Sequence, residues 1–132
     1  MMNVNLRAEG HRGESIACDY LQRIGYTIVN RNFRSKYGEI DIIAENDTHI
    51  IFVEVKSRSE TVSQKIYGRP ATAVNRKKRE HILKSTKKYL QLYKPHKSPR
   101  IDIIEQLMSP VMGTEFMQVK ITHIKAAIQD TL

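Results

Sequence analysis

Three charged residues lie inside two short apolar runs, where charge is costly unless it is paired or bound to a metal ion. Asp41 lies within residues 38–44 (GEIDIIA), and Glu54 and Lys56 lie within residues 51–56 (IFVEVK). Two carboxylates and an ammonium group in so small a segment are typical of a site that handles a divalent cation and a phosphate. The alternative is an edge hairpin with a solvated face, because edge strands carry charge that prevents aggregation.

The two runs are rich in Ile and Val and are separated by the polar residues 45–49 (ENDTH), so they predict a β-hairpin. A turn centred on this stretch places Asp41 opposite Glu54 and Glu39 opposite Lys56. Because side chains alternate between sheet faces, all four are then expected on one face. A slip of the register by one residue would remove this arrangement.

Mg²⁺ would account for the two opposed carboxylates, since it takes oxygen ligands and is usually held by one or two carboxylates together with substrate phosphates. Lys56, two residues beyond Glu54, could orient or help deprotonate a metal-bound water, or stabilise charge developing on a phosphate. Other chemistries lack support. The five histidines show no paired zinc spacing, and the chain has neither a phosphate-cradling Gly-rich loop nor a strand-to-helix nucleophile elbow.

Length and charge limit the classes of protein that fit. The chain has 132 residues and is expected to form one domain over residues 1–132, with a core from about residue 11 to 127. Its net charge of +8 indicates a polyanionic partner. The single cysteine, Cys18, excludes an internal disulfide and is expected to be partly buried. No signal peptide or membrane-spanning run is evident, which predicts a cytoplasmic protein with no membrane partner.

The hydrophobic pattern predicts an α/β fold with three consecutive strands. The predicted elements are a helix over residues 13–24, a strand over 26–34, the hairpin, a helix capped by Asn75 that runs to residue 93, strands over 100–107 and 116–121, and a turn of helix over 123–128. Residues 57–74 show little periodicity and predict a mobile loop that could close over a substrate, although disorder without a function fits the composition about as well. Asp102 is expected to be structural or exposed.

Four cations crowd the first turn of the helix that follows Asn75, where positive charge opposes the helix dipole. A bound anion would account for them, because free N–H groups and basic side chains would converge on it. By contrast, three further lysines on this helix (Lys84, Lys87 and Lys88) fit an ordinary solvated face. The candidate contacts to a nucleic-acid backbone are Arg34, Lys36, Arg58, Lys77 and Lys78.

These residues resemble the restriction-endonuclease-like superfamily with the PD-(D/E)XK signature. The sequence more closely resembles the YraN family, which is similar to archaeal Holliday-junction resolvases. Ile40 stands where the signature has its proline. The resemblance extends from about residue 11 to 127. The segments that carry it are Gly13-Glu14, Gly38-Glu39-Ile40-Asp41, Phe52 to Arg58, Gly68-Arg69-Pro70, the region of Lys77, Arg100-Ile101-Asp102 and Ile121 to Ile124.

The resemblance implies a restriction-endonuclease-like core of order α-β-β-β-α-β, a mixed central sheet flanked by helices. By analogy, Asp41 and Glu54 would hold the metal ion and Lys56 would assist the attacking water. Glu14 would approach from the first helix as a further acidic ligand or water organiser. Without the resemblance, an acid in the first turn of a helix needs no role beyond favouring the helix dipole.

Two hypotheses of different kinds follow. The first is a Mg²⁺- or Mn²⁺-dependent endonuclease that hydrolyses phosphodiester bonds in DNA, with structured or branched DNA such as junctions favoured because no element suited to base reading is evident. The second is a non-catalytic nucleic-acid-binding module that uses the same basic surface. A membrane-surface or ribosomal role rests on charge alone. Symmetric cutting of a junction would need two active sites, which makes a homodimer attractive.

Overall fold

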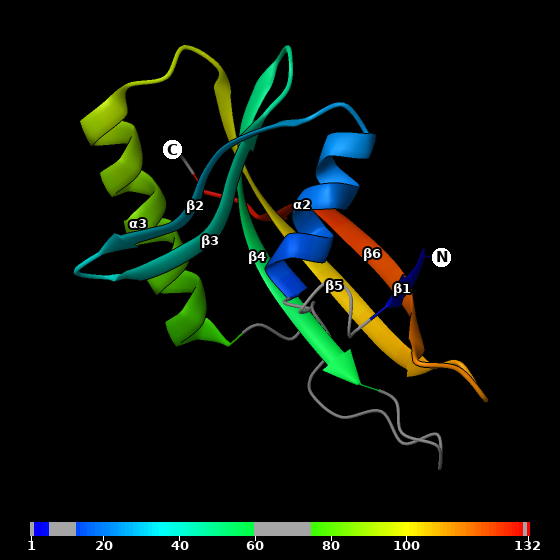
Figure 1. Cartoon of the computed structure of the whole chain (residues 1–132). Helices are drawn as coiled ribbons and strands as arrows, with labels where there is room; N and C mark the ends of the chain where they lie inside the picture. Colours follow the sequence, from blue (N-terminus) through cyan, green and yellow to red (C-terminus); the bar gives the residue numbers. More distant parts are fainter. Residues whose placement is uncertain (1, 6–12, 60–74, 131) are drawn as a thin grey trace.

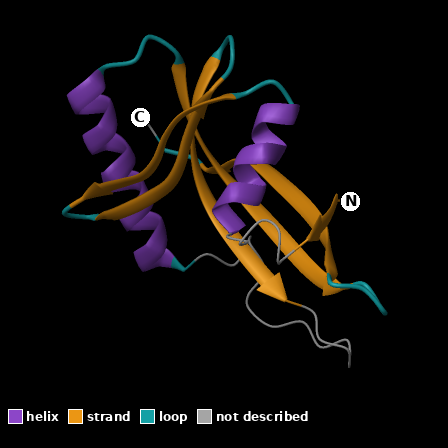
Figure 2. Cartoon of the chain, viewed as in Figure 1, coloured by secondary structure: helices purple, strands orange, loops and turns teal. Residues whose placement is uncertain are grey.

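The computed structural model describes residues 2–5, 13–59, 75–130 and 132, which form one mixed sheet with two helices (Figures 1 and 2). The strands run β1-β6-β5-β4-β3-β2 across the sheet. Among the described strands, β4 and β5 are parallel neighbours and the other pairs are antiparallel. The elements are β1 (Met2–Asn5), α2 (Gly13–Arg23), β2 (Thr27–Ser35), β3 (Gly38–Glu45), β4 (His49–Ser59), α3 (Arg76–Tyr93), β5 (Ser98–Pro110) and β6 (Phe116–Ile128).

The two helices cover opposite faces of the sheet, here called the α2 face and the α3 face (Figure 1). On the α2 face, Leu21 of the helix packs with Ile42, Ile51 and other strand residues. On the α3 face, Ile82 and Tyr89 of the other helix pack with a second set of strand residues. Burial of these apolar side chains on both faces is the main stabilising contribution to the fold. Within the described part of the chain, neither helix is long and apolar enough to cross a membrane.

The hairpin has the predicted register. Ile42 pairs with Val53 and Ile43 pairs with Phe52, which is the pairing expected for a turn centred between residues 47 and 48. The turn is closed by the backbone N–H of Asn46, which donates to the carbonyl of His49 at 3.0 Å. The Asn46 side chain also accepts from the backbone N–H groups at positions 48 and 49, so this residue fixes the register locally.

Helix α3 begins where the sequence predicts. The Asn75 side chain accepts a hydrogen bond from the backbone N–H of Lys78 at 2.8 Å and so satisfies one of the free donors of the first turn. The helix ends at Tyr93, where Lys94 adopts a left-handed conformation (φ 45°) and its N–H caps the Leu90 carbonyl.

Three elements differ from expectation. The predicted turn of helix over residues 123–128 is wrong, because β6 continues as a strand to Ile128 and pairs with β5. Strand β1 has no counterpart in the sequence prediction and is formed by pairing with the edge of β6. Of the predicted loop over residues 57–74, residues 57–59 belong to β4, and residues 60–74 lie outside the described part of the chain.

Asp102 was expected to be either structural or exposed. It is fully buried, so the structural alternative is the correct one. Arg100 donates to its carboxylate from two nitrogens, at 2.8 and 2.9 Å, and the backbone N–H of Ala126 donates at 3.0 Å. His123 Nε2 lies 2.8 Å from the same carboxylate, and Tyr20 meets the other ring nitrogen at 2.9 Å. Burial alone would raise the pKa of Asp102, but these hydrogen bonds hold it below its usual value.

Candidate active site

The regular alternation of side chains breaks where β2 and β3 carry Asn32 and Asp41. Ile42 packs on the α2 face, whereas Ile40 and its β2 partner Phe33 pack on the α3 face. Residues two apart in a regular strand share a face, so the chain changes face at Asp41. At the same level of β2, Asn32 has a left-handed backbone (φ 55°), which asparagine tolerates better than most residues.

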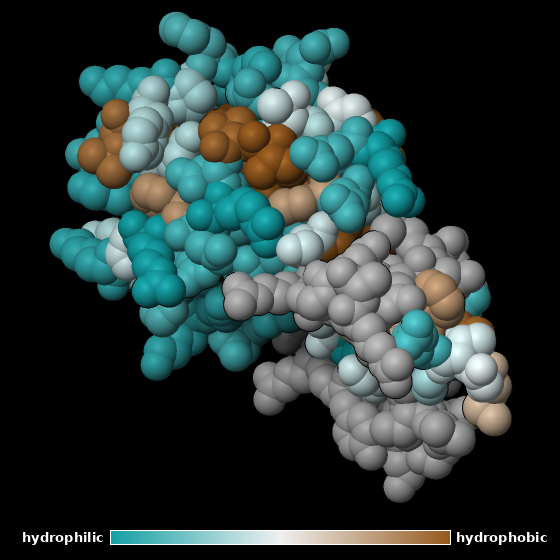
Figure 3. All heavy atoms as spheres, in the orientation of Figure 1, coloured by the Kyte–Doolittle hydropathy of each residue, from teal (hydrophilic) through white to brown (hydrophobic). Residues whose placement is uncertain are grey.

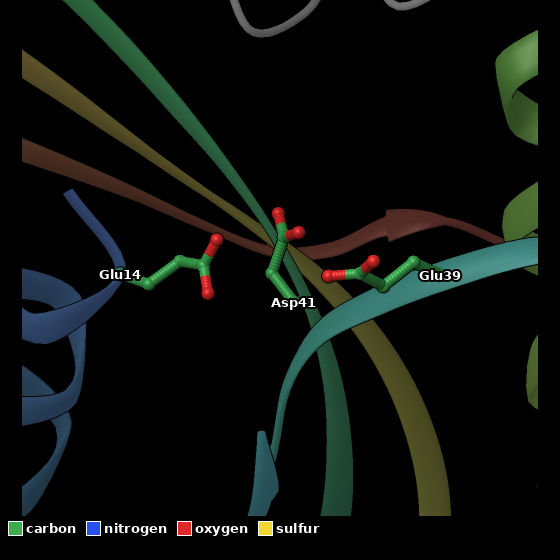
Figure 4. Close-up of side chains that lie close together, drawn as sticks. All are labelled: Glu14, Glu39 and Asp41. Atoms are coloured by element: carbon green, nitrogen blue, oxygen red, sulfur yellow. The ribbon is translucent and has the colours of Figure 1, made fainter. Parts of the chain in front are cut away.

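This break brings three carboxylates together (Figure 4). One ligand oxygen from each of Glu14, Glu39 and Asp41 lies within 4.8 Å of the others, and Asp41 lies between the other two. With its amide nitrogen facing the carboxylates, Asn32 donates to Glu14 at 2.7 Å and to Glu39 at 2.6 Å. Asp41 accepts a hydrogen bond from the backbone N–H of Val55 in β4 at 2.8 Å. The cluster therefore joins α2, β2, β3 and β4.

The position of Glu14 depends on a close approach between α2 and the sheet. Gln106, which is fully buried, donates to the Gly13 carbonyl at 2.9 Å and to the Ser57 hydroxyl at 3.1 Å. A Cβ atom at position 13 would overlap the Ser57 hydroxyl. Glycine at this position therefore lets the first turn of α2 reach the sheet and carry Glu14 to the cluster.

Glu54 of β4 faces the first turn of α3, and its negative charge also acts on Asp41. Its side chain is 6% exposed, and its Oε1 lies 3.2 Å from Lys78 Nζ and 3.8 Å from Lys56 Nζ. Its Oε2 is buried and has no hydrogen-bond partner among the described residues. A buried carboxylate oxygen without a partner is costly, and a cation is one of the few groups that would satisfy it.

Burial and mutual repulsion raise the pKa of two of these acids. Burial raises the pKa of Asp41 to about 6, and the negative charge of Glu54 adds to the effect, while the Val55 N–H and Lys78 oppose it. Burial also raises the pKa of Glu14, with Asp41 as the second cause. Buried carboxyl groups that lie close to other carboxylates hold their protons more strongly than free ones, unless a cation is bound beside them.

The predicted grouping of four residues on one face holds only in part. Asp41 lies beside Glu14 and Glu39, and the charge of Glu54, which also contacts Lys78 of α3, acts on Asp41. Glu39 forms its ion pair with Arg34, at 3.4 Å, in place of facing Lys56. Asn32 was missed by the sequence analysis, because nothing in its neighbourhood marks it as a left-handed residue at a change of face.

The five basic residues that were candidates for backbone contact fall into different environments. Lys78 is directed at Glu54, and Arg58 is paired with Glu105 and only 11% exposed. The remaining three are exposed to solvent: Arg34, Lys36 and Lys77. The structure thus brings Lys78 into the region of the acidic residues and gives Arg58 a partner within the sheet.

The element order from α2 to β5, with acids from the first helix and the central hairpin, defines an α/β protein with a restriction-endonuclease-like core. Residues 13–105 match the uncharacterised protein family UPF0102, and the chain belongs to this family. This confirms the resemblance to the YraN family seen in the sequence.

The relatives span most of the chain. A UPF0102 protein of Clostridium kluyveri is 47% identical over 97 residues, which cover 73% of this chain and 76% of the relative. One from Clostridium botulinum is 42% identical over 102 residues, covering 76% of this chain and 80% of the relative. One from Caldanaerobacter subterraneus is 39% identical over 126 residues, covering 94% and 97%.

Proposed function

We propose that this protein is a metal-dependent nuclease that hydrolyses phosphodiester bonds in DNA, with structured or branched DNA such as junctions as its substrate. The observation that carries the proposal is the convergence of Glu14, Glu39 and Asp41 within 4.8 Å of one another. Three carboxylates so close repel one another when ionised, and a divalent cation would relieve the repulsion.

The donor set fits a hard cation. Mg²⁺ or Mn²⁺ would be held by Glu14, Asp41 and Glu54, with Glu39 beside them, since carboxylate oxygens are the ligands these ions prefer. The unpartnered Oε2 of Glu54 supports its inclusion. When bound, the ion would lower the pKa of a coordinated water and offset negative charge on the phosphate.

The chain's own cations supply the rest of the chemistry. In hydrolysis, a water oxygen bonds to phosphorus and the bond from phosphorus to one sugar oxygen breaks, leaving a phosphate monoester and a hydroxyl end. Lys56 lies beside Glu54 and is 38% exposed, so its ammonium group can reach a phosphate oxygen or hold the attacking water. Lys78, at the start of α3, would hold a phosphate oxygen next to the free N–H groups of the helix.

The test is cleavage of labelled single strands, duplexes, flaps and four-way junctions, with Mg²⁺ or Mn²⁺ and with EDTA. We expect metal-dependent cutting by the wild type that falls at least 100-fold in Glu54→Gln and Lys56→Gln, with binding retained. Matched controls are Glu115→Gln and Lys120→Gln, which remove the same charges from exposed positions. Equal cutting by all variants would assign the activity to a contaminant. Binding without cutting by any of them would favour the non-catalytic binding module.

If junctions are the preferred substrate, the proposal extends to a homodimer, because two symmetric cuts need two sites. The molar mass of the protein alone and on a junction, measured by light scattering after gel filtration, checks this. Two copies on each junction are expected, and one copy that makes both cuts would contradict it.

A further inference from the structure

A second charged site lies on the outer side of α3, where the β2–β3 turn approaches the helix (Figure 1). A hollow of about 480 Å³ opens there. The described residues that line it are Lys36, Tyr37, Lys84, Lys87, Lys88 and Gln91, of which four are lysines. Lys87 is paired with Asp130 at 3.3 Å. In Figure 3 the surface over this part of the molecule, at the lower left, is largely hydrophilic.

The hollow is held open by contacts between the turn and the helix. The hydroxyl groups of Ser35 and the fully buried Ser85 lie 3.0 Å apart. At the start of β3, Gly38 (φ 133°) lies over the helix, where a Cβ would be in ordinary van der Waals contact with His81 Cβ, at 3.8 Å. The positions of the turn and the helix relative to each other are therefore set before any ligand binds.

The lysines are concentrated at the hollow despite their mutual repulsion. Lys84 and Lys88 are four residues apart on one helix face, and like charges at this spacing destabilise a helix. The ammonium groups of Lys36 and Lys84 lie 5.2 and 5.7 Å from the centre of the Tyr37 ring, where a cation–π interaction attracts them. The Tyr37 ring thus holds one lysine of the turn and one lysine of α3 beside the hollow.

This hollow is distinct from the acidic cluster. Helix α3 buries Ile82 and Tyr89 against the sheet, and at 100° per residue Lys84 projects about 150° and the half-buried Lys88 about 110° away from that buried side. None of the acidic residues of the proposed metal site, Glu54 on the α3 face included, is among the described residues that line the hollow. A ligand in the hollow would therefore not touch the carboxylates.

We infer that the hollow is a second phosphate-binding site, which takes the backbone of a nucleic-acid segment outside the cleavage site. Lysine binds phosphate as a point charge, and Lys84 and Lys88 are separated by about 6 Å along the helix axis, so successive phosphates are matched better than a single one. In a branched DNA this segment would be a second arm. The inference rests on the proposed function only for the chemical class of the ligand.

The test is equilibrium binding of fluorescent duplex and four-way junction DNA in EDTA, where no metal-dependent cleavage occurs, over a range of salt concentrations. The variant is Lys84→Gln/Lys88→Gln. The matched control is Lys120→Gln/Lys125→Gln, which removes the same charge from exposed positions on β6. We expect the hollow variant to bind roughly tenfold more weakly near 0.1 M salt, with a salt slope lower by about 2 than that of the control. Its melting temperature should stay close to that of the wild type, because loss of the repulsion between Lys84 and Lys88 offsets loss of the cation–π contact of Lys84 with Tyr37.

A hollow variant that matches the control in both affinity and salt slope would overturn the inference. Lysine acetylation read by mass spectrometry gives a second readout that needs no variant: bound DNA should protect Lys84 and Lys88 and leave Lys120 reactive. Binding of the wild type to phosphatidylserine vesicles but not to DNA would also overturn it, by assigning the hollow to a lipid surface. Failure of the nuclease proposal appears separately, as absent cleavage in Mg²⁺ with DNA binding in EDTA intact.

Discussion

The strongest electrostatic conflict at the scale of single residues is at Asp41. Its carboxyl group is partly buried among Glu14, Glu39 and Glu54, and its single backbone hydrogen bond, from Val55, does not offset their charge. The metal-free protein therefore carries a destabilising group at the centre of the proposed active site, as expected for a site whose charge is completed by a ligand.

We predict that Asp41→Asn stabilises the metal-free protein at neutral pH. The folded-state pKa of Asp41, about 6, lies above the usual value of 3.8, so the folded state binds more protons between these pH values and loses stability as the pH rises through them. In EDTA at pH 7.5 the variant should exceed the wild type by about 1–3 kcal/mol in free energy of unfolding, and the difference should vanish below about pH 4. Urea unfolding from pH 4 to 8 measures this, with Asp19→Asn as a control for charge. Parallel pH profiles of wild type and Asp41→Asn would contradict it.

Asn32 offers a test of the change of face, because its left-handed backbone is separable from its hydrogen bonds. Both Asn32→Gly and Asn32→Ala remove the amide that donates to Glu14 and Glu39, but only glycine adopts φ 55° without strain. We expect the alanine variant to be less stable than the glycine variant by about 1–2 kcal/mol in urea unfolding. Equal stabilities would show that the left-handed conformation is not required.

At the scale of single residues, the sequence predicted which residues belong to the candidate site better than it predicted how their side chains are arranged. Asp41, Glu54 and Lys56 were recognisable because charge inside an apolar run needs a reason. Their faces were predicted from a strict period of two, which a single left-handed residue interrupts. Such a residue leaves no pattern in its neighbours. The resemblance had placed Glu14 and Asp41 in one site, but the positions of Glu39 and Asn32 beside them depended on the three-dimensional structure.

At the scale of secondary structure, the first turn of helix α3 carries basic residues that look equivalent in the sequence. In the fold these residues lie in different environments. Lys78 lies 3.2 Å from the buried Glu54, while Lys77 is exposed. Both oppose the helix dipole equally, so each serves as a control for the other.

We predict that Lys78→Ala lowers the free energy of unfolding by about 1–2 kcal/mol. Its loss leaves Glu54 buried without its nearest cation, and the effect is smaller than for a fully buried pair because the Lys78 side chain is 40% exposed. Lys77→Ala should change stability by no more than about 0.5 kcal/mol. Urea unfolding of the two variants side by side decides the matter, and equal losses would contradict the pairing of Lys78 with Glu54.

Local signals also explain which elements were predictable. The side chain of Asn46 closes the hairpin turn and Asn75 caps α3, so residues within the segments themselves determine these features. Strand β1 has four residues and exists through its pairing with β6, and the end of β6 depends on its pairing with β5. Such long-range pairing is not encoded in a local period, and apolar residues at 121, 124 and 128 suit a helix equally well.

At the scale of the whole molecule, Asp102 links distant parts of the chain. Its carboxylate receives hydrogen bonds from Arg100 in β5 and from His123 and Ala126 in β6, and through His123 it connects to Tyr20 of α2. This buried hydrogen-bond network connects β5 and β6 to α2, the helix that carries Glu14.

We predict that Asp102→Asn costs about 3–5 kcal/mol, because Arg100 loses the carboxylate that balances its charge. Since the folded-state pKa of Asp102 is lowered, the stability it contributes is present above about pH 4 and is lost as the pH falls through the folded value. The wild type should therefore lose stability below pH 4 more steeply than the variant in thermal unfolding, with Asp47→Asn, which alters an exposed carboxyl, as the control. An equal acid dependence in both proteins would contradict this role.

The change of face at Asn32 and Asp41 also has a consequence for how the protein opens. Beyond the break, the tip of the β2–β3 hairpin packs on the α3 face through Phe33 and Ile40, and the Ser35 hydroxyl is hydrogen-bonded to Ser85 of α3. The other end of the hairpin packs on α2. Native-state hydrogen exchange should accordingly show the amides of the tip and of α3 exchanging together, as one cooperative unit that detaches while α2 stays docked. The lysine hollow would vanish in that opened form, so bound DNA should slow exchange in the tip and α3 together.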